Sequence, residues 1–157
     1  MKIMNKFQKK LANRKKDNKG FSLVELIIVI AIMAILVGIV GTQVIPYINK
    51  SKIEKDRQLV NSYCTAAVSA YSMVAGELTS DPTSFEVYDN SLSGSNKTVA
   101  DKIKELTYDS FDATKFKSKE AQGCSNVTIT FNSTNHTVTA TLKDAATPGD
   151  LTVTSDM

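Results

Sequence analysis

Side chains that commonly build catalytic and metal centres are scarce in this 157-residue chain. It contains one histidine, two cysteines and no tryptophan. The cysteines are far apart in the sequence, so the C-x-x-C spacing typical of zinc and redox sites does not occur. A single histidine does not supply the ligand cluster of a zinc site, and no nucleophile–histidine pair is evident. We therefore predict no catalytic residue, no metal site and no cofactor, and we expect that the protein is not an enzyme.

Positive charge is concentrated at the N-terminus. Residues 1–19 contain eight Lys or Arg and one Asp, whereas residues 21–157 contain 11 basic and 15 acidic side chains. The basic balance of the whole chain therefore comes from its first residues. This distribution indicates membrane topology and argues against nucleic-acid binding by the rest of the chain. We expect no specific nucleic-acid partner.

A long apolar segment follows the basic one. It extends from Phe21 to Ile45 and contains no polar side chain between Leu26 and Val40. A membrane-spanning helix needs about 20 apolar residues, so this segment is long enough. The positive charges before it would keep the N-terminus in the cytoplasm. The length of the segment, and the lack of an A-x-A site after it, argue against an ordinary secretory signal peptide.

One carboxylate, Glu25, lies near the start of the apolar segment. A charge at the centre of a membrane helix costs roughly 2.5–3.5 kcal/mol, and less near the interface. A chain that keeps such a group usually has a partner that compensates its charge. Glu25 is therefore a candidate functional residue, and Ser22, three residues before it, is a candidate helix cap.

The sequence GFSLVELI, residues 20–27, resembles the class III signal of type IV prepilins. The resemblance implies that a prepilin peptidase, which is also an N-methyltransferase, cuts between Gly20 and Phe21 and methylates Phe21. It also implies that Glu25 serves in filament assembly. The leader is longer than is usual before a Phe start, and Pro46 lies about one turn later than the helix-bending proline of the family.

Three regions are expected: a cleaved basic leader (1–20), an apolar transmembrane or filament-core helix (21–49) and a globular head (50–157). Apolar residues with spacings of three, four and seven predict an amphipathic helix over 50–78. We interpret the charged residues between them, including Asp56, as a solvated face. The apolar stripe consists of Ile53, Val60, Cys64, Ala67, Tyr71, Val74 and Leu78.

The remainder of the head divides into a connecting αβ region (79–123) and an antiparallel sheet (124–157). The connecting region contains an expected loop over Ser91–Asn96 and a short helix over Thr98–Leu106, with Thr98 as its cap. Alternation of apolar and polar residues predicts strands. The predicted strands are Val127–Phe131 and Thr137–Leu142, joined by a hairpin turn, and a third short strand at Leu151–Thr154.

These elements predict an α+β fold, because the apolar face of the sheet needs a cover and the helical stripe supplies it. A continuous helix from Ser22 to Leu78 would be about 85 Å long at about 1.5 Å per residue. No small domain is that wide, so the apolar half of the helix must project. The expected shape matches the lollipop that the resemblance to type IV pilins implies.

Gly38, Gly41 and Pro46 mark an expected bend in the helix, because proline removes a backbone hydrogen bond and glycine adds flexibility. The alternative is a mild kink with no role. The sequence also leaves open whether Cys64 and Cys124 form a disulfide. Cys64 belongs to the inward stripe and Cys124 precedes the first strand expected to pack on it, but the pattern is also compatible with two buried thiols that never meet.

We therefore predict a structural subunit of a type IV pilus. Its precursor would be a single-pass cell-membrane protein that is cleaved, N-methylated and polymerised into an extracellular helical filament serving adhesion or motility. Its partners would be copies of itself, the prepilin peptidase, the pilus assembly platform with its ATPase, and the membrane. The alternative is a pseudopilin of a type II secretion or DNA-uptake system. The excess of Lys over Arg indicates an AT-rich genome and a Gram-positive host.

Overall fold

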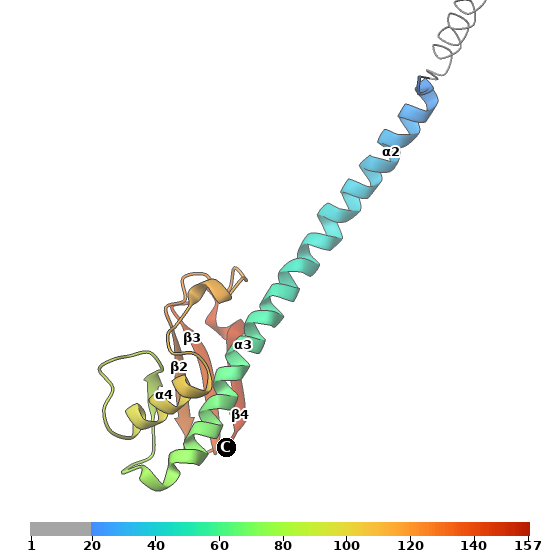
Figure 1. The fold of residues 1–157 in the computed structure, drawn as a ribbon. Helices are drawn as coiled ribbons and strands as arrows, with labels where there is room; N and C mark the ends of the chain where they lie inside the picture. The colour runs from blue at the N-terminus through green and yellow to red at the C-terminus, as the bar shows by residue number, and fades with distance from the viewer. Residues whose placement is uncertain (1–19) are drawn as a thin grey trace, which may run out of the picture. The chain divides into compact units, whose positions relative to one another are not determined.

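A computed structural model describes residues 20–157. The predicted leader lies outside the described residues, except for Gly20. The described chain divides into two compact units, with the boundary between Ile45 and Pro46, and each unit is described by itself. Figure 1 shows the order of the elements along the chain.

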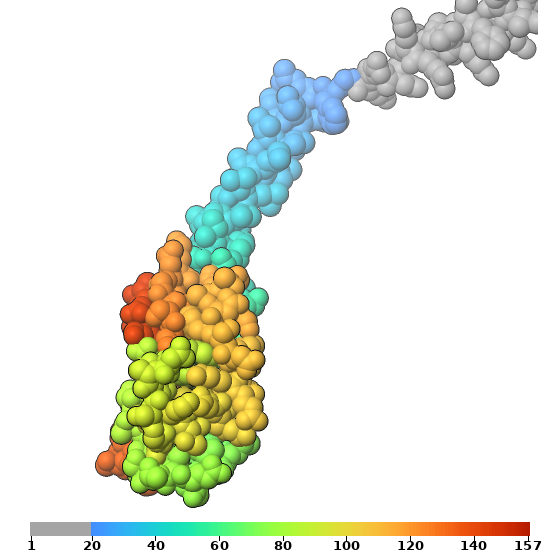
Figure 2. All heavy atoms as spheres, turned by 60° about the vertical axis from the view of Figure 1, so that its left-hand side comes forward, coloured from blue at the N-terminus to red at the C-terminus, as the bar shows by residue number. Residues whose placement is uncertain are grey.

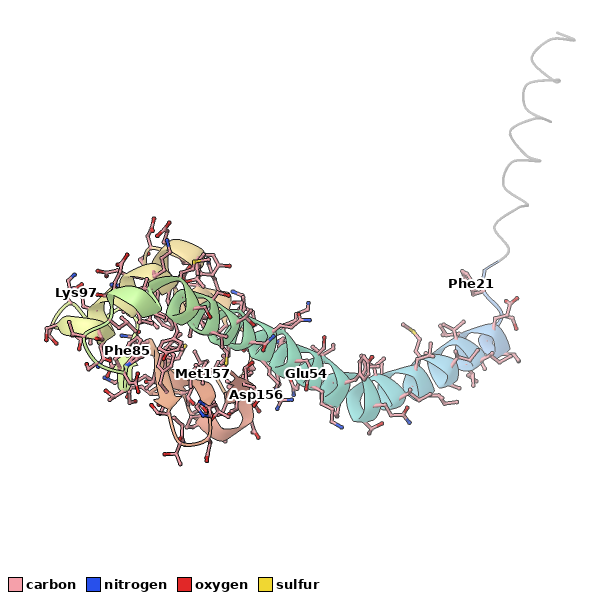
Figure 3. All side chains as sticks on the ribbon, turned by 90° about the horizontal axis from the view of Figure 1, so that it is seen from below. Phe21, Glu54, Phe85, Lys97, Asp156 and Met157 are labelled. Carbon is pink, nitrogen blue, oxygen red and sulfur yellow. The ribbon has the colours of Figure 1, made fainter. Side chains whose placement is uncertain are left out.

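The first helix, α2, extends over Leu23–Ile39 and is apolar on every side. None of its 17 residues is buried, and side chains project from the ribbon all round (Figure 3). The side chains are as exposed near the start of the helix as near its end: Leu23 is 73% exposed and Val37 is 70% exposed. Because a helix in water needs a polar face, such a helix belongs in a membrane or in the interior of an assembly. The described helix that begins at Leu23 is long and apolar enough to cross a membrane.

Helical structure continues beyond α2 without an intervening loop. A π-helical segment, η1 (Val40–Val44), leads into α3 (Ile45–Val74), and a short 3-10 turn, η2 (Ala75–Glu77), ends it. In η1 the Ile45 N–H donates to the carbonyl oxygen of Val40, five residues earlier. This wider turn comes directly before Pro46, whose ring would otherwise crowd a carbonyl one turn back.

The expected bend falls on the same stretch of chain. Thr42 Oγ1 donates to the Gly38 carbonyl oxygen at 2.9 Å, a side-chain bond that is often associated with distorted helix geometry. Gly41 lies inside η1 and Pro46 follows it. The local irregularity is thus present where Gly38, Gly41 and Pro46 predicted it, while the bend itself stays a prediction.

A four-stranded antiparallel sheet forms the centre of the second unit, with the strand order β1-β2-β3-β4. The hairpin predicted for the two central strands is confirmed, and Ile129 pairs with Ala140 at its middle. The final strand begins two residues later than expected, because the chain first makes a 3-10 turn, η4 (Pro148–Leu151), that buries Leu151. The strands are β1 (Ser84–Glu86), β2 (Asn126–Asn132), β3 (Thr137–Lys143) and β4 (Val153–Asp156).

The core lies between α3 and one face of this sheet. Val60, Cys64 and Ala67 of the predicted stripe are fully buried, in one cluster with the inward residues of β2 and β3. Figure 1 shows α3 running beside the sheet within this unit. The α+β class, with a long N-terminal helix followed by a small antiparallel sheet, is confirmed.

Helix α4 extends over Gly94–Leu106, so the expected start at Thr98 is wrong by four residues. Ser95 and Asn96, which were expected in an exposed loop, instead form hydrogen bonds with the chain segment before β1. Ser95 is buried and its Oγ accepts the Ser80 N–H at 3.2 Å. Asn96 Oδ1 accepts the Thr83 N–H at 3.0 Å. Figure 2 shows α4 and its neighbouring segments, in yellow-green to orange, gathered on one face of the unit.

Asp56 is not on a solvated face, contrary to the interpretation of the sequence. It is 1% exposed, and its two carboxylate oxygens accept the N–H groups of Lys117, at 2.9 and 3.0 Å, and of Ser118, at 2.7 Å. A buried charge is tolerated only when such partners satisfy it. Asp56 therefore attaches the segment after α4 to the beginning of α3.

Arg57, the next residue, attaches a second segment to α3. Its Nε and Nη2 donate to the Asp150 carbonyl oxygen at 3.2 and 2.8 Å. Its Nη1 donates to Glu54 Oε1 at 3.0 Å. Two neighbouring residues of one helix thus hold two loops that are far apart in the sequence.

Candidate processing and assembly site

Gly20 and Phe21 precede the first turn of α2 and belong to no helix or strand. Phe21 is 85% exposed, and Figure 3 shows it ahead of the helix. Apart from its chain neighbours, no atom of residues 20–157 lies within 4 Å of the point where a Cβ would be placed on Gly20. Among the described residues, the peptide bond predicted to be cut is therefore exposed.

Ser22 begins the helix through a reciprocal pair of hydrogen bonds. Its Oγ accepts the Val24 N–H at 3.3 Å, and its own N–H donates to Glu25 Oε2 at 2.8 Å. Ser22 is extended, with φ −63° and ψ 141°, and its carbonyl oxygen accepts the Leu26 N–H at 3.1 Å. This is a capping box, in which the N-cap and the third helical residue satisfy each other's backbone groups.

Glu25 therefore has a partner within its own chain. The Ser22 N–H and the positive end of the α2 dipole both stabilise its negative charge. The bond between Ser22 and Glu25 was not predicted from the sequence, although the Ser-x-x-Glu spacing is its signal. Cleavage after Gly20 would create a second candidate partner for Glu25, the α-amine of Phe21. Gly20, Phe21, Ser22 and Glu25 line one open hollow of about 410 Å³. The structure thus brings together the candidate cleavage, methylation and assembly residues.

Cys64 and Cys124 are both buried free thiols, so the structure contains no disulfide between them. Cys64 Sγ faces the far strands of the sheet, where it donates to the carbonyl oxygens of Val138 at 3.3 Å and Val153 at 3.7 Å. Cys124 lies in the turn before β2, where its N–H bonds to the Ala121 carbonyl oxygen at 3.1 Å. Each side chain fills its own place in the core.

Burial raises the pKa of both thiols, and for Cys124 the negative charge of Asp56 adds to this effect. Because the thiolate is the reactive form, we expect slow labelling of the folded protein. Alkylation of the unfolded, unreduced chain should modify two cysteines per molecule, as measured by mass spectrometry. A chain of monomeric mass with no alkylated cysteine would contradict this expectation, because it would show that Cys64 and Cys124 form an intramolecular disulfide.

Residues 15–41 match the family model of the prokaryotic N-terminal methylation motif. This motif is the class III signal peptide of type IV pilins, and it includes Gly20, Phe21 and Glu25. No curated protein and no solved structure matches the chain significantly. The match supports a pilin-like or pseudopilin protein whose apolar segment anchors its precursor in a membrane, and it implies processing by a prepilin peptidase.

Proposed function

We propose that this protein is the subunit of a type IV pilus. The observation that carries the proposal is an apolar helix without a buried face that begins at a methylation motif. Such a helix is covered by lipid in the precursor. Once it leaves the lipid, it needs another apolar environment, and the α2 helices of neighbouring copies supply one.

Contacts between identical subunits that do not close into a ring build a helical filament. In this proposal residues 21–49 form the core of the filament and residues 50–157 its surface. The subunit would be inserted with its N-terminus in the cytoplasm, cleaved and methylated at Phe21, and passed by the assembly platform and its ATPase to an extracellular pilus. Pseudopilins carry the same motif. In this proposal the size of the head favours the pilus over a secretion or DNA-uptake filament.

Processing gives the most direct test of the proposal. Mass spectrometry of surface fibres should find a first peptide that begins at N-methylated Phe21. Gly20→Leu should leave the uncut precursor in the membrane, because a bulky side chain does not fit a peptidase that accepts glycine before the cut. Gly76→Leu is the matched control, since Gly76 is also exposed and in open space. A fibre subunit that retains residues 1–20 would contradict the proposal.

A further inference from the structure

Glu86, Asn126 and Lys143 lie together at one end of the sheet, on the face that is turned away from the core. Each of the three is next to a core residue of its own strand, and side chains alternate between the two faces of a strand. Asn126 and Lys143 are directly opposite each other in the β2–β3 pair, so their Cβ atoms are about 4.5–5.5 Å apart. The sheet thus places an amine and an amide side by side, with a carboxylate next to both.

The Glu86 carboxylate contacts both of these groups. Its Oε1 lies 2.5 Å from Lys143 Nζ, and its Oε2 accepts a hydrogen bond from Asn126 Nδ2 at 3.2 Å. Asn126 is buried, and the side chains of Glu86 and Lys143 are only 31% and 41% exposed. An ion pair between two solvated groups contributes little to stability. This carboxylate instead bridges an amine and a shielded amide, an arrangement that allows it to move protons between them.

The carbonyl oxygen of the Asn126 side chain faces two backbone N–H groups. Asn126 Oδ1 accepts the Tyr88 N–H at 3.2 Å and the Val127 N–H at 2.8 Å. Because one end of the amide faces donors and the other end faces a carboxylate, its oxygen and its nitrogen are distinguished by their partners. Two fixed donors polarise the carbonyl carbon and stabilise the negative charge that develops on the oxygen when a nucleophile attacks. Asn126 Cγ is therefore prepared as an electrophile.

Lysine attacks only as the neutral amine, so Lys143 must first lose a proton. The hydrogen bond with Glu86 is the largest cause that raises the pKa of Lys143. The negative charges of Asp144 and Asp89 add to this effect. The amine is therefore protonated at neutral pH, and Glu86 is the base in contact with it. Partial burial favours the proton transfer between them, because the transfer replaces two charges by two neutral groups.

We propose that Lys143 and Asn126 form an intramolecular isopeptide bond, with Glu86 as the catalytic base and acid. The bond between Lys143 Nζ and Asn126 Cγ forms, and the bond between Cγ and Nδ2 breaks. The two protons that the lysine ammonium loses pass through Glu86 to Nδ2, which leaves as ammonium. No oxidant, reductant or second molecule is consumed. The step occurs once in each chain.

The isopeptide bond would close β2, the hairpin turn and β3 into one ring. The turn joins the two strands at one end, and the new bond joins them at the other. Five atoms lie between the two Cβ atoms in such a link, which is enough to span their separation without moving the backbone. Both cysteines of the described chain are free thiols, so the isopeptide bond would supply the covalent link that they do not. All its groups belong to residues 86–143, and it therefore depends on neither membrane insertion nor fibre growth.

Trypsin digestion of the full chain in detergent, followed by mass spectrometry, tests this proposal. Trypsin cuts after Lys and Arg, and neither occurs between Lys119 and Lys143 or after Lys143. An unmodified chain therefore yields the peptides 120–143 and 144–157. Because trypsin does not cut after an acylated lysine, we expect one peptide, 120–157, whose mass is lower than that of its sequence by one ammonia. Backbone fragment ions from inside the ring should be missing, because the cross-link holds the two halves together.

Glu86→Gln and Lys143→Arg should both yield a chain of full mass, because the first lacks the base and the second lacks the nucleophile. Glu105→Gln is the matched control, since it removes the partner of another lysine, Lys102, and it should keep the loss of ammonia. The two unmodified peptides from the natural chain would overturn the proposal, whatever the folding of the variants. A loss of ammonia with normal cutting after Lys143 would also overturn it, because that result indicates a succinimide at an asparagine. Ammonia loss that persists in Glu86→Gln would contradict the catalytic role of Glu86.

Discussion

We expect Glu25→Ala to leave membrane insertion and cleavage intact and to reduce fibre growth roughly 10- to 150-fold. The estimate converts the contribution of a hydrogen bond to a charged group, about 1.5–3 kcal/mol, into a docking constant. Insertion should persist because the substitution removes a charge from an apolar segment. Cleavage should persist because Gly20 and Phe21 lie outside the helix that Glu25 caps.

Glu25→Gln separates the two roles that the structure allows for this side chain. A glutamine at the third helical position can still accept the Ser22 N–H and keep the capping box. It cannot pair with the α-amine that cleavage creates on Phe21 of a neighbouring copy. We therefore expect fibre growth to fall in Glu25→Gln nearly as far as in Glu25→Ala, because the charge and not the cap drives docking.

Fibre yield per cell, measured by electron microscopy and by immunoblot of sheared fibres, checks this prediction. Glu77→Ala is a suitable control, since Glu77 lies at the far end of the same helical region and its side chain forms no hydrogen bond or ion pair with any of residues 20–157. Normal fibre yield from Glu25→Gln with a reduced yield from Glu25→Ala would show that Glu25 acts only as a cap. Normal fibre yield from both variants would show that Glu25 has no role in fibre assembly.

The largest loss of stability is expected from Asp56→Ala. The substitution leaves the N–H groups of Lys117 and Ser118 without their acceptor at a site that is 1% exposed. Leaving a buried backbone N–H without its acceptor costs about 1–3 kcal/mol for each group. Because a domain is stable by only about 5–15 kcal/mol in total, the variant head should unfold at much lower denaturant concentration.

Asp109→Ala is the matched control for this variant, because Asp109 is exposed and the substitution removes the same charge. Urea unfolding of the full chain in detergent, followed by near-ultraviolet circular dichroism of the tyrosines, measures the difference. Hydrogen exchange at the Lys117 and Ser118 amides should accelerate in Asp56→Ala only. Equal midpoints for the two variants would contradict a stabilising role for Asp56.

The elements that could be predicted from the sequence are those held by local interactions. The hairpin of β2 and β3 follows from alternation and a short turn, and both strands were located to within about a residue. The capping box at Ser22 is equally local, since its two residues are three apart. Its role could have been deduced from the spacing alone.

What the sequence could not show depends on partners far along the chain. In the sequence Asp56 is surrounded by other charged residues, which is typical of a solvated position. The N–H groups that donate to its buried carboxylate belong to residues 61 and 62 positions later in the chain. The first turn of α4 resembles a loop because Ser95 and Asn96 favour loops, yet they bond to a segment 13–15 residues earlier. Strand β1 has only three residues, too few for a periodic pattern.

The contacts of Asp56 and Arg57 also bear on the order in which the head folds. The Asp150 carbonyl that Arg57 binds is 93 residues later in the chain, and a ribosome needs roughly 5–20 seconds to add that many residues. The β2–β3 hairpin can close within microseconds once it is made. Throughout the earlier interval α3 has an apolar stripe and no sheet to cover it. The contact between Arg57 and Asp150 can form only after β2 and β3 have been synthesised, so it is among the last contacts of the head to become available.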